Sequence, residues 1–208
     1  MMGPNRPNLP YTVVQHSFGN ASNGSAGNVL AGNCTIGNII VFIAYPTTGS
    51  QSITSATSTM GTLALQTNTD TGSAYPAYIY TTVATSAAQS FTANTPGSAW
   101  ACAAWELSGG TKAIAAATPT HNTTTTASIS LGNVVIGNAA FVVMMDGSGV
   151  TAGPGGSWIL GPNGGGSNWV QYQFETDYQI VASPGILSAT WTGALSSGEW
   201  ACAGVVLS

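Results

Sequence analysis

One short string occurs twice in the chain: Trp-Ala-Cys-Ala starts at Trp100 and again at Trp200. When the sequence is compared with itself at this shift, GNCTIGN at 32–38 lies over GNVVIGN at 132–138. Further matches in the same register are Gly49 with Gly149, Tyr78 with Tyr178 and Thr92 with Thr192. Matches this widely spaced indicate an internal duplication, which we place at about 28–110 and 128–208.

Hydrophobic alternation predicts strands in both halves. Residues 170–180 alternate, with aromatic and aliphatic side chains on one face and Gln171, Gln173, Glu175, Asp177 and Gln179 on the other. This pattern is typical of a half-buried antiparallel strand, so we expect the polar face to be solvated. Residues 38–45 and 139–145 are apolar on both faces and are predicted to be central and covered.

The segments between these runs are rich in Gly, Pro, Asn and Ser, as in PTTG at 46–49 and DGSG at 146–149. No segment shows a helical period. Short strands with such turns predict an all-β fold, an antiparallel two-sheet jelly-roll-like sandwich built from two similar halves of about 100 residues. We expect the halves to interleave in one core, in a single domain at 13–208. Two separate small sandwiches are the alternative.

Residues 1–12 are predicted to be an extended N-terminal arm, because the first ten contain three prolines and have no counterpart in the second half. Arg6, Pro7, Asn8 and Leu9 are the candidate subunit-contact residues of this arm. A loose tail is the alternative. The start of the chain has no apolar segment typical of a signal peptide, so we expect synthesis in a host cytoplasm and release by lysis.

Charged residues make up only 4% of the chain, whereas ordinary domains contain about 25%. The two basic residues, Arg6 and Lys112, cannot form the basic stripe that nucleic-acid binding requires. No apolar run is long enough to span a membrane as a helix. A surface with so little charge repulsion favours a protein that packs against neighbouring subunits.

The three cysteines, Cys34, Cys102 and Cys202, are too few for a disulfide scaffold and are predicted to be small buried hydrophobic residues. The sequence leaves open whether Cys102 and Cys202 lie close enough to pair. It has no zinc-binding pattern and no calcium-loop motif, so we predict neither a metal nor a cofactor.

Catalytic chemistry finds little support in the sequence. His16 and His121 are the only histidines, and no G-x-S-x-G motif is present. Glu175 and Asp177 share a strand face, but that face is expected to be solvated rather than to line a cleft. We therefore predict a protein that is not an enzyme.

Three aromatic residues and one acid are the remaining candidates for a site. Trp158, Trp169 and Tyr172 flank a Gly-rich loop and form a candidate sugar-stacking or protein-binding site, or else cap the core. Glu106 stands where the second half has Val206, so it needs partners if it is buried. We expect a structural carboxylate bonded to amides of the following Ser-Gly-Gly turn, with an ion or glycan contact as the alternative.

The segments GNIIVFIAY, SITSATSTMGTLAL, AYIYTTV, SFTAN and WACAAWELSGG resemble a jelly-roll or concanavalin-like β-sandwich domain of phage virion and bacterial surface proteins, with a W-A-x-x-x-E-L-S-G pattern. LSATWT and EWACAGVVLS resemble its C-terminal part, so the resemblance covers about 28–208. The turn TSTMGT departs from the family's pattern and lacks its acidic residue. The resemblance implies structure or adhesion rather than catalysis.

These observations predict a non-enzymatic virion structural protein, most simply a phage capsid decoration or a head/tail accessory protein on the virion surface. The expected partners are other virion proteins and further copies of this chain, in an oligomer or lattice. The alternatives are a carbohydrate- or receptor-binding module with glycans as partners, as in a tail fibre or lectin, or an extracellular filament subunit.

Overall fold

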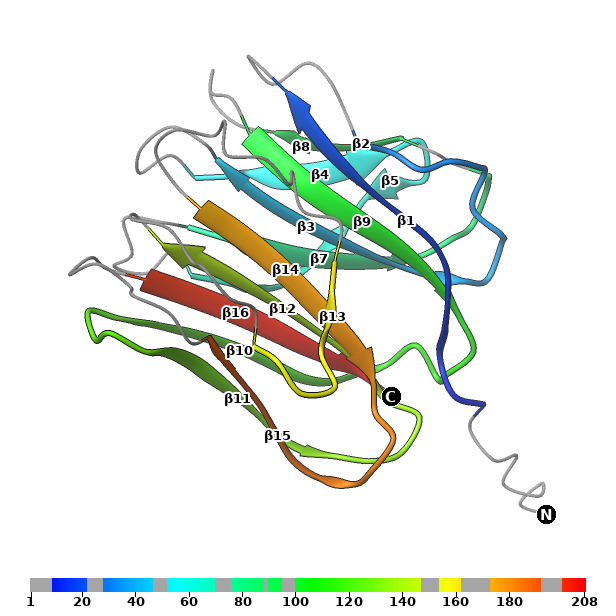
Figure 1. The fold of residues 1–208 in the computed structure, drawn as a ribbon. Coiled ribbons are helices and arrows are strands. Elements are labelled where there is room, and N and C mark those ends of the chain that lie inside the picture. The colour runs from blue at the N-terminus through cyan, green and yellow to red at the C-terminus, as the bar shows by residue number, and fades with distance from the viewer. Residues whose placement is uncertain are drawn as a thin grey trace.

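The fold consists of β-strands joined by turns (Figure 1). The computed structural model describes residues 9–21, 28–46, 52–69, 76–87, 90–94, 100–146, 154–161, 173–191 and 200–208. The first half contains β1 (Thr12–Ala21), β2 (Asn28–Val29), β3 (Ile39–Pro46), β4 (Ser55–Ser58), β5 (Gly61–Thr62), β6 (Ala64–Asn68), β7 (Tyr78–Val83), β8 (Ser90–Asn94) and β9 (Trp100–Ser108). The second half contains β10 (Ile114–Asn122), β11 (Ala127–Val134), β12 (Ala139–Asp146), β13 (Ile159–Leu160), β14 (Gln173–Ile180), β15 (Gly185–Trp191) and β16 (Trp200–Leu207).

The strand pairs of the first half are nested, with the first strand beside the last. β1 pairs with β9, β2 with β8, β3 with β7 and β4 with β5, all antiparallel. The pairs alternate between two sheets, whose strand orders are β1-β9-β3-β7-β6 and β2-β8-β4-β5. This winding of a long antiparallel ribbon into two sheets is a jelly roll.

The second half repeats this winding. β10 pairs with β16, β11 with β15 and β12 with β14. The sheet orders are β10-β16-β12-β14-β13 and β11-β15, so each strand of the larger sheet has a counterpart at the same place in the first half. The predicted antiparallel jelly-roll-like sandwich of two similar halves is confirmed.

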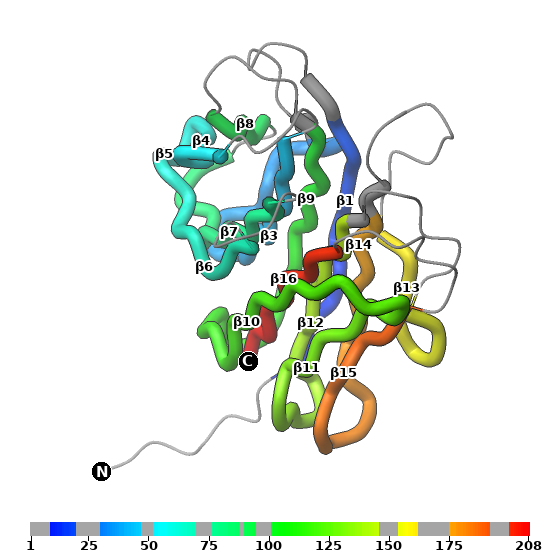
Figure 2. Tube along the Cα trace, turned by 90° about the vertical axis from the view of Figure 1, so that its left-hand side faces the viewer, coloured from blue at the N-terminus to red at the C-terminus, as the bar shows by residue number. Residues whose placement is uncertain are grey.

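The halves are stacked rather than interleaved, which differs from the expected arrangement. Each sheet of the described residues takes its strands from one half, and Figure 2 shows the two halves as bodies side by side. Two hydrophobic clusters fill the interiors of the two jelly rolls. A third cluster lies between the two five-stranded sheets and joins the halves. The central strands β3 and β12 are therefore covered on both faces, as their continuous apolar sequences predict.

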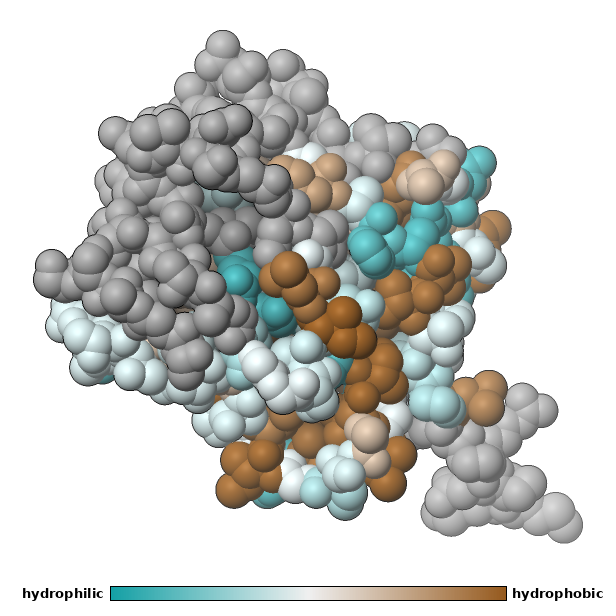
Figure 3. All heavy atoms as spheres, in the orientation of Figure 1, coloured by the Kyte–Doolittle hydropathy of each residue, from teal (hydrophilic) through white to brown (hydrophobic). Residues whose placement is uncertain are grey.

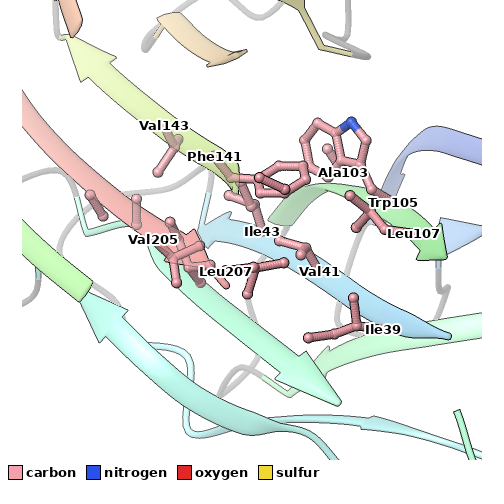
Figure 4. Packing of buried hydrophobic residues seen from close by; sticks show 14 of the residues in the cluster. Ile39, Val41, Ile43, Ala103, Trp105, Leu107, Phe141, Val143, Val205 and Leu207 are labelled. Atoms are coloured by element: carbon pink, nitrogen blue, oxygen red, sulfur yellow. The ribbon is translucent and has the colours of Figure 1, made fainter. Parts of the chain in front are cut away.

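Trp105 of β9 is the largest side chain in the cluster between the halves, and it is fully buried. Its ring meets the ring of Phe141 of β12 edge to face, with centroids 5.2 Å apart. Figure 4 shows both rings among aliphatic side chains of β3, β9, β12 and β16. The second half has Val205 in the position of Trp105, so the two halves contribute unequal side chains to their shared core.

The two large sheets face each other with opposite strand orders. β6, at one edge of the first sheet, lies against β10 and β16 of the second. Gly161, which follows β13 at the far edge of the second sheet, lies against Trp105 of β9. The central strands β3 and β12 run in the same direction in Figure 1. The halves are therefore related by an approximate two-fold rotation about an axis along the strands, which places equivalent turns at the same end.

The turns before β3 and β12 are nearly identical. Gly37 has a φ of 89° and Gly137 a φ of 88°, values that favour glycine. The Gly37 amide donates to the Ala84 carbonyl, and the Gly137 amide donates to the Val181 carbonyl. The repeated Ile-Gly-Asn sequence thus encodes a repeated turn.

Strand pairing shows where the sequence register fails. Ile39 pairs with Val83 and Ala139 pairs with Ile180, so β7 and β14 correspond at a shift of 97 residues. The match of Tyr78 with Tyr178 is therefore wrong as a structural equivalence: the partner of Ala44 is Tyr78, and the partner of Met144 is Glu175. The correspondence also extends beyond the sequence repeat to β1 and β10, which occupy the same place beside β9 and β16.

The chain enters the fold at the junction of the two halves. The Leu9 carbonyl accepts a hydrogen bond from the Gly110 amide, although the Leu9 side chain is 72% exposed. The Tyr11 hydroxyl donates to the Ser208 carbonyl and accepts from the Lys112 amide. Residues 9–11 therefore contact their own chain. Arg6, Pro7 and Asn8 of the predicted arm lie outside the described residues.

The three cysteines are buried and form no disulfide. Cys102 belongs to the core of the first jelly roll and Cys202 to the core of the second. Cys102 and Cys202 are therefore not paired with each other.

Candidate functional site

Trp158 is the one member of the predicted aromatic site that lies within the described residues. Its ring is partly buried against the core of the second jelly roll. Its indole N–H donates to the Ser188 carbonyl of β15 over 3.1 Å. These contacts tie the ring to the fold, as in the core-capping alternative. Trp169 and Tyr172 lie outside the described residues.

The two histidines lie on edge strands of different sheets. His16 is exposed on β1 and His121 is exposed near the end of β10. Within the described ranges, no cluster of three or more His, Cys, Asp or Glu side chains could hold a metal ion. Neither histidine is described with an acidic partner that would orient it for catalysis.

Glu106 on β9 is fully buried and accepts three hydrogen bonds. Its Oε1 accepts from the Thr35 amide and from Asn38 Nδ2, each over 2.7 Å. Its Oε2 accepts from Gln15 Nε2 over 2.5 Å. The amides of the Ser-Gly-Gly turn, which we expected as partners, are not the donors. The carboxylate instead holds the turn before β3 and the edge strand β1.

Burial raises the pKa of Glu106, but the hydrogen bonds from Gln15, Thr35 and Asn38 outweigh it and leave the pKa below its ordinary value. The equivalent place in the second half contains no charged residue. There, Ala116 and Val206 form the strand pair that corresponds to Gln15 and Glu106, and the Val135 amide donates a hydrogen bond to Asn138 Oδ1. The polar cluster therefore replaces an apolar pair at an equivalent place.

An acidic pair, Glu175 and Asp177, lies inside the second jelly roll, on the strand face that the sequence predicted to be solvated. That prediction is wrong: Asp177 is 2% exposed and Gln179 is 3% exposed. Glu175 Oε1 accepts a hydrogen bond from the indole N–H of Trp191 over 2.8 Å. The equivalent positions of the first half carry Tyr78 and Tyr80, which are stacked in its core.

Burial, the charge of Glu175 and the hydrogen bond to it raise the pKa of Asp177 to about 8. Burial also raises the pKa of Glu175. One of the two carboxyls thus holds a proton at neutral pH. Alternation in the sequence shows that these acids share a face, but it carries no signal that another layer covers that face.

Two exposed apolar residues recur at equivalent positions in both halves. Ile36 and Ile136 are at the tips of the matching turns and are 68% and 66% exposed. Leu65 of β6 pairs with Tyr80, and Leu160 of β13 pairs with Asp177, so these leucines also correspond. They are 46% and 60% exposed, on the edge strands of the two large sheets. We call these four residues the repeated apolar positions.

Other exposed apolar residues lie near them. In the view of Figure 3, hydrophobic residues gather in a band that passes over β13 towards the end of β14. Val135, in the turn before β12, is 60% exposed, and Ile186 of β15 is 77% exposed. These exposed side chains are aliphatic.

Comparisons with known proteins leave the family open. No protein-family description and no curated relative matches the chain. One solved structure, the major capsid protein P2 from bacteriophage PM2, aligns over 92% of this chain and 97% of its own at 10% identity. Its TM-score of 0.21 is too low to carry an argument. In the described part of the chain, there is no helix with the length and hydrophobicity to cross a membrane.

Proposed function

We propose that this protein is a non-enzymatic structural component of a virus particle, most specifically a capsid decoration or head/tail accessory protein. It packs against neighbouring subunits through the repeated apolar positions. The proposal places the protein on the virion surface, with other virion proteins and copies of itself as partners. The jelly-roll fold supports this class, because it is common in viral capsid proteins and also in lectins.

The observation that carries the proposal is the recurrence of exposed Ile36 with Ile136 and of exposed Leu65 with Leu160. The halves differ at most positions, including core positions such as Trp105 and Val205. Folding does not require an isoleucine at a turn tip with most of its surface in water. Contact with a partner gives a physical reason for the same apolar side chain at equivalent exposed places.

The free energy gained by burying these side chains favours many weak contacts over one strong contact. Fully burying a side chain such as Ile or Leu contributes about 1.5–3 kcal/mol, and these four are already partly buried. Scaled by the exposed fractions, their sum is about 4–7 kcal/mol, which lies within the ~4–15 kcal/mol cost of association. A single pair of subunits therefore gains little, whereas a lattice gains from linked contacts.

The test compares particle incorporation of double variants. We expect Ile36→Ser/Ile136→Ser and Leu65→Ser/Leu160→Ser to fold normally and to fall about tenfold in copies per particle, because each loses more than about 1.4 kcal/mol of contact energy. Val14→Ser is the matched control, since Val14 is 49% exposed and lies outside the repeated apolar positions. Quantitative mass spectrometry of purified particles gives the copy number. Unchanged incorporation of both double variants would remove the basis of the proposal.

A further inference from the structure

The two carboxyls of β14 lie in an interior position that the fold otherwise fills with hydrophobic residues. Glu175 and Asp177 pair across the sheet with Met144 and Val142 of β12, which belong to the core of the second jelly roll. That core also takes residues from β11, β15 and β16. The acids therefore face the layer formed by β11 and β15.

No positive charge balances the pair within the described structure. The described parts of β11, β12, β13, β15 and β16 contain no Lys, Arg or His. Among the described residues of this core, the other titratable side chain is Cys202, whose pKa is raised by burial, so it stays neutral. Asp146 ends β12, and its side chain lies outside the described residues. Two adjacent carboxylates, with Asp177 buried and Glu175 partly buried, cannot both be ionised at low cost when no described cation lies beside them.

The hydrogen bonds show how one negative charge is held. The indole N–H of Trp191, from the end of β15, donates to Glu175. A side-chain hydrogen bond joins Glu175 to Asp177, and Asp177 Oδ2 has no partner. Because an ionised carboxylate only accepts, a bond between two carboxyls requires a proton on one of them.

We propose that Glu175 and Asp177 share one proton, that this proton holds β14 against the β11–β15 layer, and that its loss at alkaline pH loosens the second jelly roll but not the first. In the first jelly roll, Tyr78 and Tyr80 fill the equivalent positions, so no carboxyl pair stands there. The duplication thus supplies one pH-insensitive and one pH-sensitive copy of the same fold. This inference is independent of the proposed virion function.

The direction of the pH effect follows from the raised pKa of Asp177. The carboxyl titrates at about pH 3.9 in an unfolded chain and at about pH 8 in the folded one. Between these values the folded state binds the proton more tightly, so stability is greatest near the lower value and falls as pH rises. Above the folded pKa the loss is complete.

The experiment measures urea unfolding of the full chain from about pH 5 to about pH 9, which covers most of the range between the unfolded and folded pKa values of Asp177. We expect the unfolding constant to rise by up to about tenfold per pH unit. Asp177→Asn should remove most of this rise and make the protein more resistant to urea at the alkaline end. Glu106→Gln is the control, because the lowered pKa of Glu106 lies outside the window. It should leave the slope unchanged.

Two further readouts keep the proposal testable if a variant folds poorly. In the wild type, carboxyl carbon NMR should show one Asp titrating at about pH 8. Hydrogen exchange, corrected for its intrinsic pH dependence, should show protection lost in β14 and β15 but retained in β7 and β8. An ordinary Asp titration, or an equal slope in Asp177→Asn, would overturn the proposal. Full recovery of alkaline stability by added Ca²⁺ would overturn it too, since the pair would then be a cation site.

Discussion

The polar cluster around Glu106 offers a quantitative test, because the second half of the molecule shows the same place built without it. The informative variants are Glu106→Val, Gln15→Ala and their combination, which installs the Ala116–Val206 pair of the second half. Glu106→Val removes one acceptor group that serves three donors. The donors of Gln15, Thr35 and Asn38 then need other partners inside the fold.

The cost can be worked out from these bonds. A hydrogen bond to a charged group contributes about 1.5–3 kcal/mol, and a buried donor left without a partner costs about 1–3 kcal/mol. Asn38 can turn its amide oxygen to the Thr35 amide, as Asn138 does for Val135, which limits the loss. We expect Glu106→Val to destabilise by about 3–5 kcal/mol. Gln15→Ala alone should cost about 1–2 kcal/mol, because its bonds to Gly32 are also lost.

The double variant should cost at least about 1 kcal/mol less than the sum of the single variants, because Gln15 and Glu106 share one interaction. The assay is urea unfolding near neutral pH, followed by circular dichroism and fitted with separate transitions for the two halves where they appear. A Glu106→Val variant within about 0.5 kcal/mol of the wild type would refute the reasoning. Strict additivity would show that the two side chains act independently.

Two further predictions concern packing. Trp105→Ala should lower the free energy of unfolding by about 3–5 kcal/mol, because Trp105 fills the core between the two halves. The halves should then unfold less cooperatively, so calorimetry should show separated transitions. A single transition at the wild-type temperature would contradict this prediction. Gly110→Ala should destabilise by about 3 kcal/mol, since a Cβ would lie 2.0 Å from the Tyr11 ring at a φ of 56°. Gly132→Ala, at a φ of 76° with open space around it, should cost only about 1 kcal/mol, and equal losses for the two glycines in thermal unfolding would contradict this account.

Much of the fold follows from the sequence, for a physical reason. Strands buried on both faces must be apolar throughout, so β3 and β12 are recognisable, and the Ile-Gly-Asn turns repeat because only glycine tolerates their backbone geometry. The edge strands β1 and β10 are half exposed, so their side chains diverged and the sequence shows no match between them. The shift of 97 residues between β7 and β14 could not be recognised from the sequence, because Tyr78 and Tyr178 are identical residues at positions that are not equivalent in the fold.

The candidate sites were predicted less well than the fold. The unusual position of Glu106 was visible from its repeat partner Val206, but its donors were not, since Gln15 comes from an edge strand outside the detected repeat. The burial of Asp177 was missed because alternation separates two faces without telling which one a further layer covers. The equivalence of Leu65 and Leu160 depends on strand pairing and has no signal in the sequence register.

The copy number of this protein in purified virus particles from its source culture tests the central claim most directly. Quantitative mass spectrometry against a labelled standard would measure it, with a major capsid component as the internal reference. A surface lattice or accessory role predicts many copies in each particle, in a fixed ratio to that reference. Absence from the particles, with the protein found free in the culture, would contradict the claim that it is a virion component.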